Sequence, residues 1–127
     1  MRSQKAKTQS IKFMSQKNGK VVTAFGEPAK RYAQKLENDP NVKSYEVNIP
    51  LDNWQQTISR VGLRKEYMDV EWTSDFLIVF QDDSVGIREL LPERFLLKAA
   101  EMEKLEISRR YWKAGHVGNW MIVLAEG

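Results

Sequence analysis

The sequence predicts an α/β fold in which one central mixed sheet is flanked by helices. Three observations favour this class: apolar runs of strand length, one long segment with helical periodicity, and the alternation of the two along the chain. The chain has 127 residues, of which 42% are hydrophobic and 29% charged. These values are ordinary for a globular protein, so we expect a single domain with its own core.

The first predicted helix begins beside Pro28, since proline suits the first helical turn, and ends near Glu37. Residues 38–40 read Asn-Asp-Pro and stop it. From 42 to 49 apolar and polar residues alternate as in a half-buried strand, with an apolar set of Tyr45, Val47 and Ile49. The segment 53–72 mixes helical and extended patterns and yields no assignment.

A β-hairpin and a crossover follow. Residues 76–80 form an apolar run typical of a buried strand, 81–84 form a tight turn, and 85–91 return as the partner strand. From 93 to 114 apolar residues recur at steps of three and four, which predicts a long helix whose inner face carries Phe95, Ala99, Met102, Leu105 and Trp112. The uncharged run 120–124 is typical of a strand covered on both faces.

The charge is unevenly distributed. Residues 1–20 carry six basic side chains and no acidic one, whereas the remaining 107 residues sum to −3. We therefore predict a basic flexible tail over 1–20 and a folded domain over 21–127. The tail either follows a nucleic-acid backbone or only keeps the chain soluble. On the first alternative the contacting residues are Lys5, Lys7, Lys12, Lys17 and Lys20.

Several classes of protein are excluded by composition. The chain has no cysteine, so disulfides and thiolate metal sites are absent. No apolar run has membrane-spanning length, and no apolar segment follows the basic N-terminus as in a signal peptide. We expect a cytoplasmic protein without a membrane partner.

Two carboxylates are candidates for a metal site. Asp75 begins the strand 76–80 and Glu89 lies near the end of the returning strand, so the hairpin brings them side by side. Such a pair can share one Mg²⁺ or Mn²⁺ ion, which polarises a phosphate and helps to generate hydroxide. The alternative is a pair of solvated acids at strand ends. Arg109 and Arg110 lie on the outer side of the long helix, where they either grip nucleic acid or form a solvated face.

Three blocks of sequence resemble the TnsA-like endonuclease N-terminal domain family, the endonuclease subunit of heteromeric transposases. The first runs from Glu27 to Leu51 with Leu36 to Val42 at its centre, and the second is Thr73 to Leu77 followed by a turn at Asp82. The third is Glu103-Lys104-Leu105-Glu106 with Arg109-Arg110-Tyr111-Trp112 and the closing strand around Trp120 to Val123. The resemblance covers residues 20–126 and implies a restriction-endonuclease-like αβββαβ core. It also implies DNA, a transposase subunit and an ATPase regulator as partners. It stops before the C-terminal domain with which larger relatives contact that regulator.

The family site consists of a helix Glu, a strand-start Asp, and a Gln or Glu two residues before a Lys. Asp75 and Glu89 match the second and third positions, whereas the helix Glu falls on Ala29 and the Lys on Leu91. Lys98 is our candidate for a cation that has moved to another element. The resemblance therefore implies a DNA-associated protein of a transposon, phage or other mobile element that binds DNA and a divalent metal with a degraded nuclease site. The alternative is an active Mg-dependent endonuclease with migrated catalytic residues, and a third is an unrelated protein with a convergent core.

Overall fold

The computed structural model describes residues 9–93 and 98–125. Its elements form a two-stranded sheet, β1-β2, and a four-stranded sheet in the order β3-β4-β5-β6. In chain order they are β1 (Ser10–Ser15), β2 (Lys20–Phe25), α2 (Glu27–Glu37), β3 (Val42–Pro50), α3 (Trp54–Thr57), the 3-10 helix η1 (Lys65–Tyr67), β4 (Thr73–Phe80), β5 (Val85–Pro92), α4 (Ala99–Ala114) and β6 (Asn119–Ala125).

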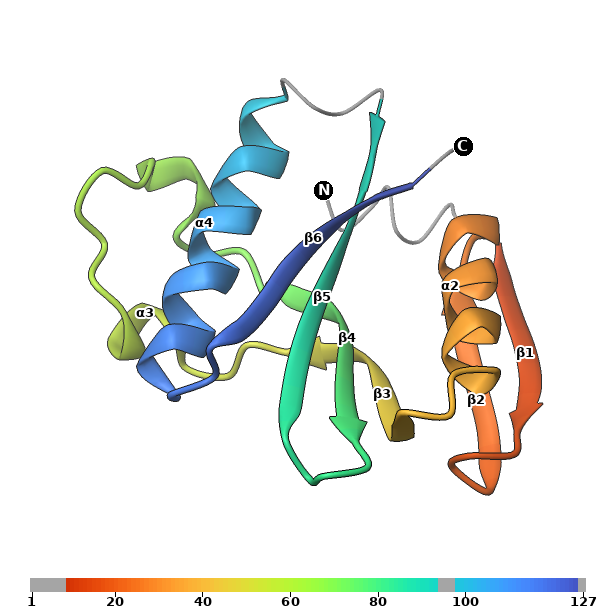
Figure 1. The fold of residues 1–127 in the computed structure, drawn as a ribbon. Helices are drawn as coiled ribbons and strands as arrows, with labels where there is room; N and C mark the ends of the chain where they lie inside the picture. The colour runs from red at the N-terminus through yellow and green to blue at the C-terminus, as the bar shows by residue number, and fades with distance from the viewer. Residues whose placement is uncertain (1–8, 94–97, 126–127) are drawn as a thin grey trace.

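The four-stranded sheet is mixed. The pairs β3-β4 and β4-β5 are antiparallel, whereas β5 and β6 run parallel and are joined by the crossover helix α4. Figure 1 shows α4 on one side of this sheet, with α2 and the β1-β2 hairpin on the other. The predicted α/β class with a mixed sheet and flanking helices is confirmed.

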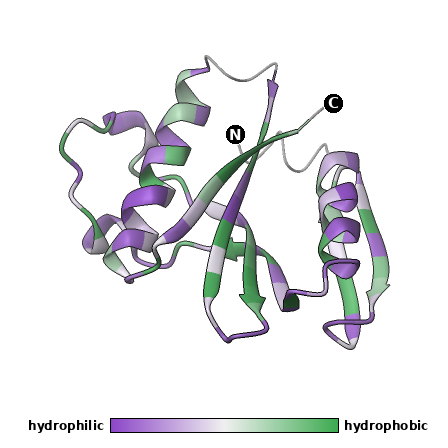
Figure 2. Ribbon diagram, viewed as in Figure 1, coloured by the Kyte–Doolittle hydropathy of each residue, from purple (hydrophilic) through white to green (hydrophobic). Residues whose placement is uncertain are grey.

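Two apolar clusters hold these layers together. One joins the hairpin, α2 and the sheet through the buried side chains of Val22, Ala33, Leu36, Val42, Tyr45, Phe76 and Ile78. The other lies beneath α4 and is formed by Leu51, Trp54, Trp72 and Ile107. Figure 2 shows the resulting pattern, in which β4 is largely hydrophobic whereas α2 turns a mainly hydrophilic side to the viewer. Among the described residues no helix has both the length and the apolar character needed to cross a bilayer.

The predicted α2 and the β4-β5 hairpin are confirmed, but three details of the crossover are wrong. The long helix begins at Ala99 rather than near 93, and Phe95 lies outside the described residues. Ala99 and Met102 were expected to face inward, but both are exposed, Met102 to 39%. The run in β6 was expected to be covered on both faces, yet Met121, Ile122 and Leu124 are exposed because β6 is an edge strand.

The flexible tail predicted over residues 1–20 is wrong for its second half. Residues 10–15 are the strand β1, which pairs with β2 in antiparallel register from Ser10–Phe25 to Ser15–Lys20. Side chains alternate, so that one side of the hairpin is buried while the other is exposed. The turn contains Asn18-Gly19, with Gly19 at φ 69°, a conformation that suits glycine in hairpin turns. Residues 1–8, including Lys5 and Lys7, lie outside the described part of the chain.

Polar contacts fix the hairpin to the rest of the domain. The carboxylate of Glu37, at the end of α2, accepts hydrogen bonds from the Ser15 hydroxyl and, at 2.6 Å, from the Tyr45 hydroxyl. The Asn18 side chain both donates to the Tyr45 carbonyl and accepts from the Tyr45 amide, at 2.7 and 3.0 Å. Lys17 Nζ donates to the Val42 carbonyl at 2.6 Å. The hairpin is therefore an integral part of the fold.

Glu37→Gln is expected to lower the free energy of unfolding at pH 7 by about 1–3 kcal/mol, the usual worth of hydrogen bonds to a charged group. Burial opposes ionisation of Glu37, but the hydrogen bonds from Ser15, Tyr45 and Lys17 outweigh it and lower the pKa of the carboxyl. A lowered folded pKa contributes stability above the unfolded value of about 4.3, and this contribution disappears as pH falls through the folded pKa. Urea unfolding at pH 7 and pH 3 measures both effects.

Glu27→Gln provides the matched control, since Glu27 lies at the other end of the same helix with a 60% exposed side chain. It should change the free energy of unfolding by no more than a few tenths of a kcal/mol, as for exposed ion pairs. Equal losses in the two variants would contradict the docking role of Glu37.

Candidate functional site

Asp75 and Glu89 face one another where β4 and β5 separate. The backbone ladder between these strands ends at the pair Phe76–Arg88. Beyond it the two carboxylates bind the backbone amides themselves: Asp75 N donates to Glu89 Oε1 at 3.2 Å, and Leu90 N donates to Asp75 Oδ2 at 2.7 Å. The juxtaposition that the hairpin predicts is therefore present, and both side chains are held by backbone of the opposite strand.

A third charged group, Lys104 of α4, reaches both carboxylates. Its Nζ lies 3.6 Å from Asp75 Oδ2 and 3.6 Å from Glu89 Oε1. Because both oxygens lie 3.6 Å from the same nitrogen, the distance between them is at most twice 3.6 Å. The side chains of Lys104 and Asp75 are 12% and 13% exposed, and that of Glu89 is 0% exposed. The three groups form a nearly dry ionic cluster, in which charge interactions are much stronger than in water.

A network of hydroxyl and indole groups holds the Glu89 carboxylate in place. Ser108 Oγ donates to Glu89 Oε2 at 2.5 Å and lies 3.2 Å from Ser74 Oγ. Trp120 Nε1 donates to Ser108 Oγ at 2.9 Å, and Trp112 Nε1 donates to Ser74 Oγ at 2.8 Å. Both oxygens of Glu89 thus have partners, and the carboxylate has one fixed orientation.

The surroundings shift the protonation equilibria of this cluster in favour of a charged lysine. Burial raises the pKa of Glu89, Lys104 opposes that rise, and the neighbouring Asp75 adds to it. Burial alone would lower the pKa of Lys104, but the carboxylates of Asp75, Glu89 and Glu101 outweigh it and raise that pKa above its ordinary value. Lys104 is therefore a permanent cation beside two acidic groups of which one, Glu89, binds a proton more readily than usual.

The carboxylate pair provides some of the ligands that a small divalent cation needs. Mg²⁺ commonly takes one or two protein carboxylates and completes its coordination with water. The oxygens Asp75 Oδ2 and Glu89 Oε1 converge on one point, the Lys104 nitrogen, which shows that both face the same small space. Within the ranges 9–93 and 98–125 no group of three or more acidic, histidine or cysteine side chains is arranged to hold a metal. A cation here would thus have two protein carboxylates as ligands.

The other sequence-based candidates lie elsewhere. Lys98 is the exposed residue that precedes α4, and the lysine at both carboxylates is Lys104, six residues later in the chain. Ala29, at the helix-glutamate position, packs against the core cluster on the α2 side. Leu91, at the motif-lysine position, is buried on the same side of β5 as Glu89.

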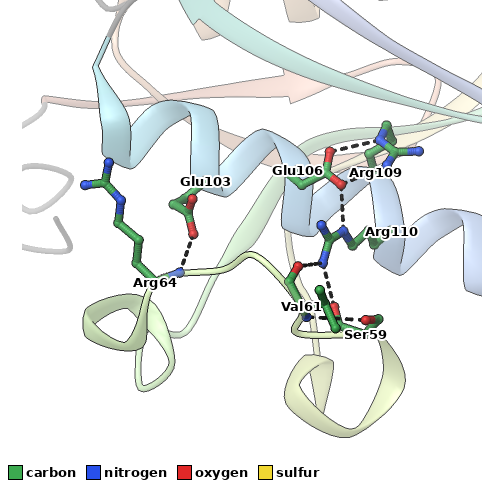
Figure 3. A network of polar contacts seen from close by, with 7 residues as sticks. All are labelled: Ser59, Val61, Arg64, Glu103, Glu106, Arg109 and Arg110. Carbon is green, nitrogen blue, oxygen red and sulfur yellow. Dashed lines mark hydrogen bonds and ion pairs between the residues drawn. The ribbon is translucent and has the colours of Figure 1, made fainter.

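Arg109 and Arg110 take part in a network along α4. Both guanidinium groups bind the Glu106 carboxylate, and Arg110 also donates to the carbonyls of Ser59 and Val61 at 2.8 and 3.0 Å (Figure 3). Arg110 therefore fixes the loop before η1. Its predicted contact with nucleic acid would require it to leave these partners, whereas Arg109 binds only its helix neighbour among the described residues.

Sequence reasoning missed Lys104 because a lysine within an amphipathic helix is ordinarily assigned to its outer face. The signal was nevertheless present. Lys104 lies four residues before Ser108 and eight before Trp112, and such spacings put the three on one side of a helix. It also belongs to the Lys-Leu-Glu block that carries the family resemblance.

Comparison with known proteins gives no further assignment, because neither the family models nor the curated protein sequences match this chain. The fold and site define a mixed α/β domain with a buried Asp-Glu-Lys cluster between β4, β5 and α4.

Proposed function

We propose that this chain is a DNA-directed, metal-dependent phosphodiesterase with a restriction-endonuclease-like core, in which Lys104 supplies the cation that the sequence motif lacks at Leu91. The observation that carries the proposal is the position of Lys104 Nζ, 3.6 Å from both Asp75 and Glu89. The element order and the strand directions of the four-stranded sheet agree with an αβββαβ core. The resemblance to the TnsA-like family makes DNA of a mobile element the expected substrate.

In this proposal the three residues have distinct roles. Asp75 and Glu89 would hold Mg²⁺ or Mn²⁺, and the bound ion would polarise the phosphodiester and favour hydroxide over water. Lys104 carries a fixed positive charge at the same place, so it stabilises negative charge that develops on phosphoryl oxygens. Ser108 and the Asp75 amide keep Glu89 in one orientation, which preserves the geometry of the pair.

A second function, DNA binding without cleavage, is favoured by the full burial of Glu89. Both of its oxygens already have partners in Ser108, Lys104 and the Asp75 amide. In that case the ammonium of Lys104 takes the place of a metal beside the two carboxylates, and the cluster only stabilises the fold.

Nicking of supercoiled plasmid DNA with Mg²⁺ or Mn²⁺ separates these functions. The parent protein is expected to nick only with metal, and Asp75→Asn is expected to reduce the rate by about 10²–10³, as for loss of one preorganised electrostatic group. Asparagine keeps an oxygen that can accept from the Leu90 amide, so the fold should survive. Circular dichroism and thermal unfolding check this point.

Asp69→Asn is the matched control, since Asp69 is an exposed acid outside the cluster. It should nick at the parental rate. Metal-independent nicking, or equal nicking by the two variants, would show that the activity does not come from this site. A parent that shifts DNA in a gel but never nicks it would establish the binding function instead.

A further inference from the structure

The outer side of the β1-β2 hairpin is an exposed two-stranded surface. Strand alternation and the pairing register put three cross-strand pairs there: Ser10–Phe25, Lys12–Thr23 and Met14–Val21. The side chains of Met14, Val21 and Phe25 are 57%, 55% and 39% exposed. Single exposed apolar residues are common, but three on one small face indicate a surface that binds something.

The charge of this hairpin indicates what it binds. Residues 9–26 contain three lysines and no acidic residue. Lys12 lies in the middle of the outer face, whereas strand alternation puts Lys20, beside the turn, on the opposite side with Val22; both are exposed. Neither forms an ion pair or a side-chain hydrogen bond with any residue in the described part of the chain. Lys17 differs, since its ammonium is bonded to the Val42 carbonyl.

We propose that the outer face of this hairpin, defined by Lys12, Met14, Val21, Thr23 and Phe25, binds in the major groove of duplex DNA. A two-stranded ribbon fits that groove, which is about 12 Å wide. Lys12 then contacts a phosphate, because phosphates attract cations irrespective of sequence. Thr23 can bond to base edges, and the apolar side chains can contact thymine methyl groups. This inference deepens the proposed function, because it rests on DNA being the ligand.

The rigid attachment of the hairpin makes it suitable for this role. Its buried side packs on α2 through Val22, and the bonds of Glu37 and Asn18 fix its turn to α2 and β3. The backbone of a ribbon held in this way is already ordered before binding, which lowers the entropic cost of association. Deleting residues 1–20 would remove β1 and uncover the core, so point variants are the appropriate test.

The test measures binding of a 20-base-pair duplex in EDTA, with Asp75→Asn in all proteins so that cleavage plays no part. Lys12→Gln should weaken binding and reduce the slope of log affinity against log salt by about 0.9, the value for one phosphate contact. Lys65→Gln removes one exposed lysine elsewhere and is the charge-matched control. Methyl green, a major-groove ligand, should displace the protein, and netropsin, a minor-groove ligand, should not.

The possible failures are distinct. Equal slopes for Lys12→Gln and Lys65→Gln, or displacement by netropsin alone, would overturn the groove contact of the hairpin while leaving DNA binding by the protein intact. A parent that binds no duplex would overturn the proposed function together with the ribbon. A dimer in sedimentation velocity that dissociates in Met14→Gln/Val21→Gln, with unchanged DNA affinity, would make this face an interface between copies and overturn the inference.

Discussion

Lys104→Met is expected to lower the free energy of unfolding by about 3–5 kcal/mol, the usual cost of removing one partner from a buried ion pair. Methionine fills a similar volume, so the loss arises from charge rather than from a cavity. It leaves Asp75 and Glu89 close together with no cation between them. Chemical denaturation with urea at pH 7 gives the value directly.

Two further variants identify the cause. Lys113→Met makes the same change at an exposed position of the same helix and should leave stability within about 0.5 kcal/mol of the parent. Adding Glu89→Gln to Lys104→Met should recover a large part of the loss, because a neutral amide can be buried without a counter-charge. A double variant no more stable than Lys104→Met would mean that the lysine acts through packing alone.

The pH dependence of Lys104→Met has a definite sign. Burial raises the pKa of Glu89 and Lys104 opposes that rise, so removing the ammonium raises this pKa further. A carboxyl with a raised folded pKa favours folding when protonated. That contribution is complete below the unfolded pKa of about 4.3 and is lost as pH rises through the folded pKa. The deficit of Lys104→Met relative to the parent should therefore be smaller at pH 4 than at pH 8.

Local signals were sufficient to predict the carboxylate pair. The turn at 81–84 and the apolar strand before it define a hairpin, and pairing across that hairpin puts Asp75 opposite Glu89 without knowledge of other elements. The position of Lys104 could not be predicted from local signals, because the side of α4 that faces the sheet depends on how the helix packs over β5. The hydrophobic pattern predicted the inner face of α4 only approximately, since Met102 was assigned to that face and is exposed.

The hairpin β1-β2 was missed for a different reason. Composition suggested a tail, since lysine, serine, glutamine and asparagine dominate the first twenty residues. The alternation of Ile11 and Phe13 with polar residues, followed by Asn18-Gly19, was nevertheless a hairpin signal. In β6 the opposite error occurred. An uncharged run indicates burial but cannot tell a central strand from an edge strand, because that difference is set by the order of strands in the sheet.

Moving the ammonium from helix to strand should restore activity that is lost when Lys104 is removed. Lys104→Leu is expected to reduce metal-dependent nicking by about 10²–10³. Adding Leu91→Lys puts a lysine two residues after Glu89, on the same side of β5, which is where the family motif has it. If Lys104 replaces that motif lysine, the exchanged variant should nick at least about tenfold faster than Lys104→Leu, since tenfold corresponds to only about 1.4 kcal/mol of transition-state stabilisation.

Leu90→Lys in the Lys104→Leu background is the matched control. Leu90 is the neighbouring residue of β5, but it packs against the cluster on the α2 side of the sheet, away from Glu89. Its lysine should therefore give no gain in nicking. Plasmid assays with all four proteins, together with their unfolding curves, distinguish recovery of charge from recovery of stability. No gain in a folded Lys104→Leu/Leu91→Lys variant would show that position 91 does not reach the carboxylates. Lys104 would then be a cation specific to this arrangement of α4, not a displaced motif residue.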